Sequence, residues 1–340
     1  MLSINERLMM FSAGDRVLME ITVSRFLQWK PNVFLYRKLG WQFASSYLFF
    51  LGSLYFAVKE EEKEKISSSV KKVFGIEKPP SDLQDLSKRI LQGILCHYFE
   101  KIFNAYQSIP VLTSFMADHI SAPALYKLDD ALKQKKGVIF VTGHYGGIEY
   151  IPIFMSMHHY PVSVVFRCAT SQLQETLHGK AKHLGIEVID PSQGNTMGAM
   201  IRSLRKNRIV FVECDEIEAW KPSQKEKMIF LGRTIGVDRS LNILQKRSNA
   251  EIVFGILHRW DLSNYTFIIK TYRDILSCLE NPQSSPAAAI LKFLESHIYA
   301  HPEEWYQWKH YANLGSASTP TKTGKAKKPL PFFKTCFRPS

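Results

Sequence analysis

The segment TGHYGGIEYIP carries the residue types and the spacing most able to do chemistry in this chain of 340 residues. His144 follows an apolar run that predicts a buried strand, and Glu149 comes five positions later, in a predicted helix. An imidazole titrates near neutral pH and can remove a proton from an attacking hydroxyl, while a carboxylate on its other nitrogen fixes the tautomer. The pair therefore predicts general base catalysis by His144, with Glu149 as the residue that orients it.

Gly146 and Gly147 stand between these two residues. Glycine lets the backbone turn sharply and approach a ligand closely, and amides at the start of the next helix could donate to a developing oxyanion. The attack of an alcohol on a thioester would need such donors. A structural histidine near a strand end is the alternative interpretation, and these residues alone leave it open.

The elements that must position these residues follow from the pattern after Gly137, where apolar runs alternate with amphipathic segments. Such alternation is typical of an α/β fold. Strands are predicted at residues 137–143, 161–167, 186–190, 208–215, 250–259 and 265–272, and helices at about 171–184, 196–207 and 239–248. We expect a central mixed sheet flanked by helices, with the active site at the strand ends.

The stretch of residues 41–58 carries no charge and approaches the roughly 20 apolar residues that a bilayer span needs. Its serines and Gln42 weaken it as a spanning helix, whereas Lys30, Arg37 and Lys38 before it could meet anionic lipid head groups. A membrane-embedded or interfacial helix and a buried core helix both stay open.

Three domains are predicted from changes in composition. The charged run at 59–65 and the turn-rich EKPPSD at 77–82 place a boundary near residue 80, and Ser81 predicts the N-cap of a long amphipathic helix. Residues 1–80 form a helical, membrane-associated module in this interpretation, and residues 81–312 form the catalytic domain. Residues 313–340, rich in Pro, Ser, Thr and Lys, predict a basic disordered tail.

The net charge of +13 favours a polyanionic partner or an anionic membrane surface. Nucleic acid is not expected, because neither an aromatic RNA-binding signature nor zinc-finger spacing is present. The five cysteines, an odd number without CxxC spacing, predict no disulfide framework and a reducing, cytosolic location. His158 and His159 are adjacent, so their rings diverge on a helix, and no metal is predicted.

The order of the motifs resembles the bacterial lipid A biosynthesis acyltransferases, also called late, HtrB-type lysophospholipid acyltransferases. The matching segments are GHYGGIE, a strand ending at Arg167, HLGIEVID, the strand VFVECD ending at Asp215, FLGRTIGV with Gly232 and Arg233, and HPEEWYQW near the end. The resemblance covers roughly residues 85–312. This chain departs from the family where Glu216 and Ile217 follow Asp215, since many relatives have Gln and Asp there.

The resemblance implies a glycerolipid-acyltransferase-like fold and transfer of a fatty acyl group onto a hydroxyl of a (glyco)lipid acceptor such as a lipid A precursor. The donor would be an acyl carrier protein or coenzyme A thioester, used as a co-substrate with no further cofactor. The location implied is the cytoplasmic face of the inner membrane. A hydrolytic, thioesterase-like enzyme and a non-catalytic basic lipid-binding protein are the alternatives.

The remaining candidate residues each have a functional and a structural interpretation. Arg167 would bind phosphate or support the oxyanion, or would simply pair with Asp215 or Glu149. Asp215 would orient the acceptor or hold Arg167, or would cap a loop or helix. Gly232 and Arg233 would shape a turn over the donor, or would belong to a hairpin between residues 230 and 237.

Trp305 and Trp308 in the closing motif fit a membrane interface or the acyl groove, and they fit the core equally by type. Large aromatic side chains in such a segment are more often core residues. We therefore predict that both indoles are buried.

Overall fold

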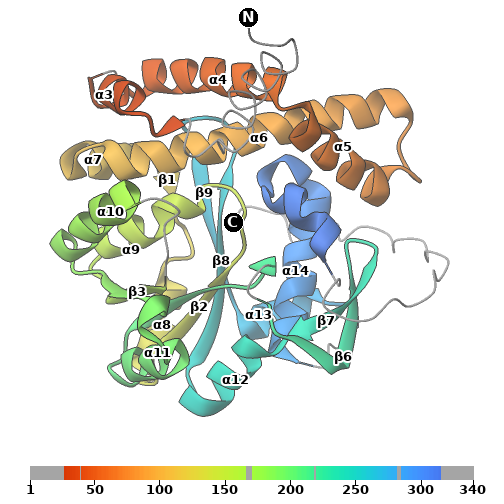
Figure 1. Cartoon of the computed structure of the whole chain (residues 1–340). Helices are drawn as coiled ribbons and strands as arrows, with labels where there is room; N and C mark the ends of the chain where they lie inside the picture. The colour runs from red at the N-terminus through yellow and green to blue at the C-terminus, as the bar shows by residue number, and fades with distance from the viewer. Residues whose placement is uncertain (1–26, 39, 166–170, 218–219, 282–284, 315–340) are drawn as a thin grey trace, which may run out of the picture.

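A seven-stranded mixed sheet forms the centre of the computed structural model, which describes residues 27–38, 40–165, 171–217, 220–281 and 285–314 (Figure 1). Its strands are β1 (Ile120–Ser121), β2 (Val138–Thr142), β3 (Val162–Val165), β4 (Glu187–Ile189), β5 (Ile209–Glu213), β8 (Glu251–Arg259) and β9 (Tyr265–Thr271). They lie in the order β1-β9-β8-β2-β5-β3-β4, and only β8 and β9 pair antiparallel. The α/β fold with a mixed sheet is therefore confirmed.

The burial of the central strand β2 explains why the sequence shows an uninterrupted apolar run there. All five of its residues are buried, because helices cover both faces of the sheet and leave no polar face to alternate with. The six strands predicted from the sequence are all present. Five of them are shorter than the predicted run by one to three residues, and for the run 161–167 the last two positions lie outside the described residues.

The helices that flank the sheet also follow the sequence pattern. They are α8 (Tyr126–Lys133), α9 (Ile151–Met157), α10 (Ser171–His183), α11 (Thr196–Arg205), α12 (Arg239–Ser248), α13 (Tyr272–Cys278) and α14 (Pro286–Ala300). The three predicted helices between strands correspond to α10, α11 and α12. Short 3-10 turns at Ile148–Tyr150, Pro191–Gln193, Pro302–Glu304 and Gln307–Asn313 complete this region.

The predicted hairpin is present as a separate two-stranded sheet, β6 (Pro222–Phe230) and β7 (Arg233–Asp238). Leu231 and Gly232 join the strands with φ of 47° and 76°, the left-handed conformation that a two-residue hairpin turn requires. Glycine adopts this conformation without strain, so the turn accounts for Gly232.

The described residues ahead of β1 form the helices α3 (Lys30–Lys38), α4 (Trp41–Val58), α5 (Glu60–Phe74), α6 (Pro80–Tyr106) and α7 (Ile109–His119). The long helix α6 runs across one end of the sheet, and α4 lies along its outer side (Figure 1). The prediction that Ser81 caps α6 is wrong. The helix begins with Pro80 after Pro79, because a proline at the first position needs no hydrogen-bonded N–H.

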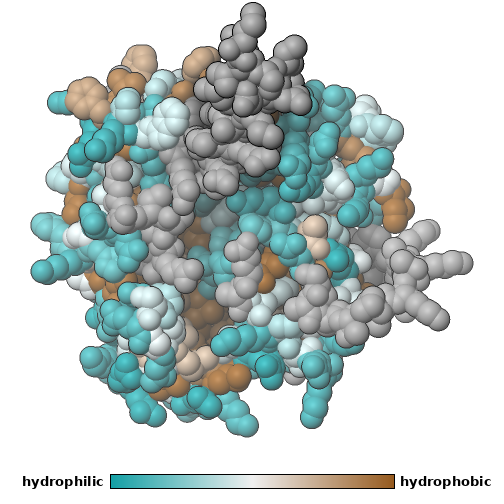
Figure 2. All heavy atoms as spheres, in the orientation of Figure 1, coloured by the Kyte–Doolittle hydropathy of each residue, from teal (hydrophilic) through white to brown (hydrophobic). Residues whose placement is uncertain are grey.

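Helix α4 has one face in the core and one face exposed. Leu48 and Tyr55 are buried, whereas Phe43, Phe50 and Leu54 are more than half exposed. Hydrophobic atoms are accordingly visible along the top of the molecule, where α3 and α4 lie (Figure 2). Among the described residues, no helix combines the length and the apolar character needed to cross a membrane.

Two predicted features lie outside the described residues. Arg167 falls in the segment 166–170, and most of the predicted tail falls in residues 315–340. The predicted boundary near residue 80 coincides with the start of α6, and one cluster of buried hydrophobic residues includes described residues from both sides of it, from Leu27 to Leu314.

Candidate active site

The carboxyl ends of β2 and β5 form the centre of the candidate site, because these two strands are parallel neighbours. Thr142 at the end of β2 pairs with Glu213 at the end of β5, and the backbone N–H of Cys214 donates to the Thr142 carbonyl at 2.8 Å. The segments that follow the two strands therefore leave the sheet side by side. This register brings His144 next to Asp215, although 71 positions separate them.

Asp215 holds His144 through three contacts. The backbone N–H of His144 donates to both carboxylate oxygens at 3.0 Å, and its Nδ1 lies 2.9 Å from Oδ1. The carboxylate is fully buried, and the indole Nε1 of Trp305 donates to its Oδ2 at 2.7 Å. A carboxylate at Nδ1 favours the tautomer that carries its proton there, so Nε2 is left as the basic nitrogen.

The partner of His144 is thus Asp215, which differs from the predicted pairing with Glu149. The Glu149 carboxylate lies 3.6 Å from Lys101 Nζ and 3.8 Å from His97 Nε2, both on helix α6. Its backbone carbonyl accepts from the Asn104 side chain at 2.9 Å. The turn at Ile148–Tyr150 therefore directs Glu149 toward α6. The group in contact with Nδ1 of His144 is instead Asp215, from the segment that follows β5.

Gly146 and Gly147 also have a different role from the one expected. Their N–H groups donate to the carbonyls of Glu304 at 2.9 Å and of Leu257 at 2.8 Å, so these two amides are engaged within the protein. A Cβ at Gly146 would come within 2.0 Å of the Leu257 carbonyl oxygen. The close approach that requires glycine here is thus to a neighbouring strand.

Two further carboxylates flank Nε2 of His144. Glu213 Oε2 lies 3.5 Å away and Glu216 Oε2 lies 3.3 Å away. Burial opposes the imidazolium, but the negative charges of Glu213 and Asp215 outweigh it, and the pKa of His144 is raised well above 6.5. Histidine in this site therefore holds its proton more tightly than free histidine does.

His144, Glu213 and Glu216 are also the one group of described residues whose donor atoms are spaced as in a metal site, all within 4.8 Å of one another. Neither His158 nor His159 belongs to it. Ion pairing of an imidazolium with two carboxylates accounts for the same distances. The prediction that this chain binds no metal therefore stays a prediction.

His144 and Glu149 both line a cavity of about 1000 Å³. Its polar part carries Glu213, Glu216, Lys101, Lys180, Lys309 and His310, and its apolar part carries Ile153, Val164, Leu177, Leu184, Ile186, Met200 and Phe211. The apolar part lies among β3, β5, α9, α10 and α11. We call this apolar part the apolar arm. A cavity with a basic nitrogen, charged groups and an apolar arm suits an amphipathic ligand.

Gly232 and Arg233 are not among the residues that line this cavity. Arg233 donates to the carbonyls of Tyr311 and Ala312 at 2.8 and 2.9 Å, and its guanidinium lies over the Tyr311 ring. These contacts fasten the hairpin to the end of the described chain. They agree with the structural interpretation of both residues.

Glu213 and Glu216 beside the candidate base, and Lys101 beside Glu149, were not singled out from the sequence. Glu213 lies two positions before Asp215 and Glu216 directly after it, so their closeness to His144 follows once β5 is known to lie beside β2. No feature of the sequence indicates the contact between Trp305 and Asp215. The sequence predicts only that both indoles of the closing motif are buried, and both are fully buried.

The model of one protein family, described as bacterial lipid A biosynthesis acyltransferase, matches residues 24–310. This range covers the whole sheet, the cavity and both halves of the contact between His144 and Asp215. A comparison with curated proteins finds no match.

The raised pKa of His144 gives a direct test of the site's electrostatics. An NMR titration of the imidazole is expected to give a midpoint clearly above 6.5, with the proton lost as pH rises through it. Glu216→Gln removes one of the surrounding charges and should lower the midpoint. Glu280→Gln, at an exposed position outside the cavity lining, is the control and should leave it unchanged. A wild-type midpoint at or below 6.5 would contradict this description.

Proposed function

The chain belongs to the bacterial lipid A biosynthesis acyltransferase family, an acyltransferase family, and on this premise we propose a specific reaction. A fatty acyl group moves from a thioester of acyl carrier protein or coenzyme A to a hydroxyl of a (glyco)lipid acceptor such as a lipid A precursor. The observation that carries the proposal is the position of His144, held by Asp215 at the wall of a cavity with an apolar arm.

In the proposed mechanism the neutral form of His144 is the general base. Because the surrounding carboxylates raise the pKa of the ring, this form is reached when the imidazolium loses its Nε2 proton. Nε2 of the neutral ring takes the proton of the acceptor hydroxyl while the hydroxyl oxygen bonds to the thioester carbonyl carbon. The tetrahedral intermediate then breaks its carbon–sulfur bond, and the leaving thiolate takes the proton back from Nε2. Asp215 stabilises the imidazolium between the two steps, so no covalent enzyme intermediate is needed.

The apolar arm of the cavity is the proposed site of the acyl chain. Val164, Leu177 and Met200 line it together with the other apolar residues named above. Each methylene group transferred from water into such an arm contributes about 0.8 kcal/mol. The depth of the arm would therefore set which chain lengths bind best.

The lysines of the cavity are proposed to bind phosphate groups of the donor or the acceptor. Lys101 and Lys309 line the same cavity as His144, and Lys180 donates to the carbonyls of Asn104 and Gln107 at the end of α6. Burial lowers the pKa of Lys180 to about 8. The resemblance adds Arg167 as a further contact for anionic groups.

The exposed face of α4 is proposed to contact the membrane surface from which the acceptor comes. Phe43, Phe50 and Leu54 lie on that face without a charge among them, and Lys30 and Lys38 on α3 are exposed beside it. Aromatic residues with adjacent basic groups suit the boundary between head groups and acyl chains. The inner membrane and its cytoplasmic face remain part of this proposal.

The first experiment offers radiolabelled acyl carrier protein and coenzyme A thioesters, in separate reactions, to purified protein with a bacterial lipid extract. We expect labelled lipid with the wild type and a loss of on the order of 10²- to 10⁴-fold with His144→Ala, because general base catalysis contributes about that much. His183→Ala, an exposed histidine on α10, is the control. Labelled free fatty acid without labelled lipid would show a hydrolase instead.

Replacing Asp215, the partner of His144, should slow the same proton-transfer step. Asp215→Asn removes the negative charge that stabilises the imidazolium, so kcat for acyl transfer should fall about 10²-fold or more, with a smaller change in KM. Asp261→Asn is the matched control, because Asp261 only caps an exposed loop through Ser263 and Asn264. Equal activity of the two variants would remove Asp215 from the mechanism.

Membrane contact through α4 can be measured by sedimentation with anionic lipid vesicles. Phe43→Gln combined with Phe50→Gln should weaken binding by about 10-fold or more, since burying even one phenylalanine contributes about 1.5 kcal/mol or more. Ile229→Gln changes another exposed apolar residue, on β6, and should leave binding unchanged. Binding that both variants weaken alike would contradict a role for this face.

A further inference from the structure

The segment of Glu304, Trp305 and Tyr306 runs antiparallel against the backbone that carries His144. The Gly146 N–H donates to the Glu304 carbonyl at 2.9 Å, and the Tyr306 N–H donates to the His144 carbonyl at 3.2 Å. Tyr145 and Trp305 form the bridge between these two bonds. We call residues 304–306 the strap, because these backbone hydrogen bonds fasten them to the His144 loop.

Trp305 carries the strap's contact to the proposed catalytic pair. Its Nε1 donates to Asp215 Oδ2 at 2.7 Å, while Asp215 Oδ1 lies 2.9 Å from His144 Nδ1. Both Trp305 and Asp215 are fully buried, so water does not compete for this bond. The indole therefore fixes the rotation of the carboxylate, and the carboxylate fixes the ring of His144.

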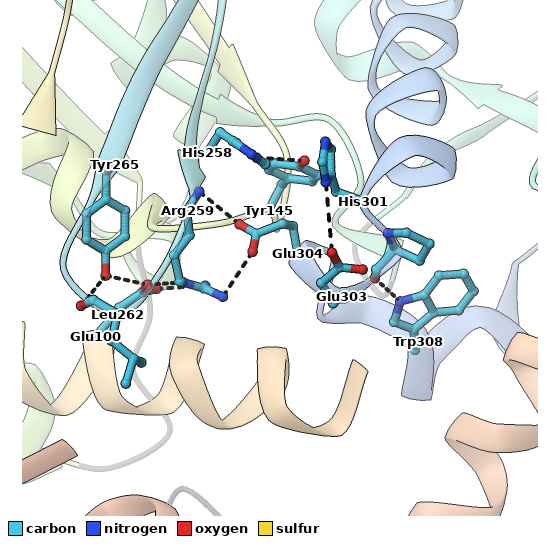
Figure 3. A network of polar contacts seen from close by, with 11 residues as sticks. Glu100, Tyr145, His258, Arg259, Leu262, Tyr265, His301, Glu303, Glu304 and Trp308 are labelled. Atoms are coloured by element: carbon cyan, nitrogen blue, oxygen red, sulfur yellow. Dashed lines mark hydrogen bonds and ion pairs between the residues drawn. The ribbon is translucent and has the colours of Figure 1, made fainter. Parts of the chain in front are cut away.

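A buried ion network holds the strap in place (Figure 3). Arg259 at the end of β8 donates from its backbone N–H to Glu304 Oε2 at 3.1 Å, and its Nη1 lies 3.2 Å from Glu304 Oε1. The other edge of the guanidinium pairs with Glu100 of α6 at 2.7 and 3.3 Å, and the Tyr265 hydroxyl donates to the same carboxylate. The position of Trp305 is thus fixed from three elements.

We propose that Trp305 is a positioning residue for the reaction, which acts on His144 through Asp215 and whose N–H, rather than its bulk, is the essential group. The inference rests on the proposed function, because it assigns a role in the same acyl transfer. It goes beyond the burial predicted for this residue from the sequence, which a phenylalanine ring would satisfy almost as well.

The chain contains a matched control for this proposal in Trp308. This side chain is also fully buried and packs against Trp305 with ring centroids 4.9 Å apart. It donates one hydrogen bond from Nε1 to the Pro302 carbonyl at 2.8 Å (Figure 3). Trp308→Phe therefore removes the same volume and the same kind of bond as Trp305→Phe. Only Trp305 reaches Asp215.

The test compares both variants with the wild type in thermal unfolding, in acyl transfer kinetics and in the NMR signal of the His144 Nδ1 proton. We expect similar losses of melting temperature in the two variants. Trp305→Phe should lower kcat about 10- to 100-fold with little change in KM, and it should broaden or shift the Nδ1 proton signal. Trp308→Phe should retain both the signal and a kcat close to that of the wild type.

Two results would overturn the proposal: an equal loss of kcat in the two variants, or an unchanged Nδ1 proton signal in Trp305→Phe. The NMR measurement needs no substrate, so it keeps this proposal separate from the proposed function. If the wild type transfers no acyl group while Trp305→Phe still changes the signal, the positioning role of the indole stands and the assigned reaction fails.

Discussion

The buried carboxylate of Asp215 is the constraint on which the rest of the site depends. A fully buried anion is costly unless hydrogen-bond donors surround it, and here the donors are the backbone and ring of His144 and the indole of Trp305. These donors come from the loop after β2 and from the strap. Hydrogen bonding to this one carboxylate therefore fixes three segments that are far apart in the sequence: the loop after β2, the segment of Asp215 and the strap.

A second buried group extends this arrangement to the helices outside the sheet. Arg259 lies between Glu100 and Glu304, and burial raises the pKa of Glu100 to about 7 against the opposing charge of Arg259. Removal of one partner from such a group leaves an uncompensated buried charge, so its geometry is tightly held. Because Glu100 belongs to α6, on which α4 packs, the proposed membrane face and the candidate base share one framework.

The fold was largely predictable from the sequence, because buried parallel strands leave long apolar runs and the helices between them leave amphipathic ones. His144 at the end of β2 could be singled out for the same reason. Its partner could not, since the order of strands in the sheet decides that β5, and with it Asp215, lies beside β2. Glu149 is nearer in sequence, but its turn directs it to α6. Likewise, the sequence leaves the amides of Gly146 and Gly147 as possible donors to a ligand. It does not show that the carbonyls of Glu304 and Leu257 lie beside these amides and accept their hydrogen bonds.

In the proposed reaction, Nε2 of His144, with Asp215 on Nδ1, accepts the proton of the acceptor hydroxyl. The most direct test is a crystal structure of the protein with a lipid acceptor and an unreactive thioester analogue, in which the distance from the acceptor hydroxyl oxygen to Nε2 is measured. We expect a separation of about 2.6 to 3.2 Å, with the contact between Nδ1 and Asp215 retained. An acceptor hydroxyl bound to Glu149, with the ring of His144 turned away from it, would contradict this role of His144.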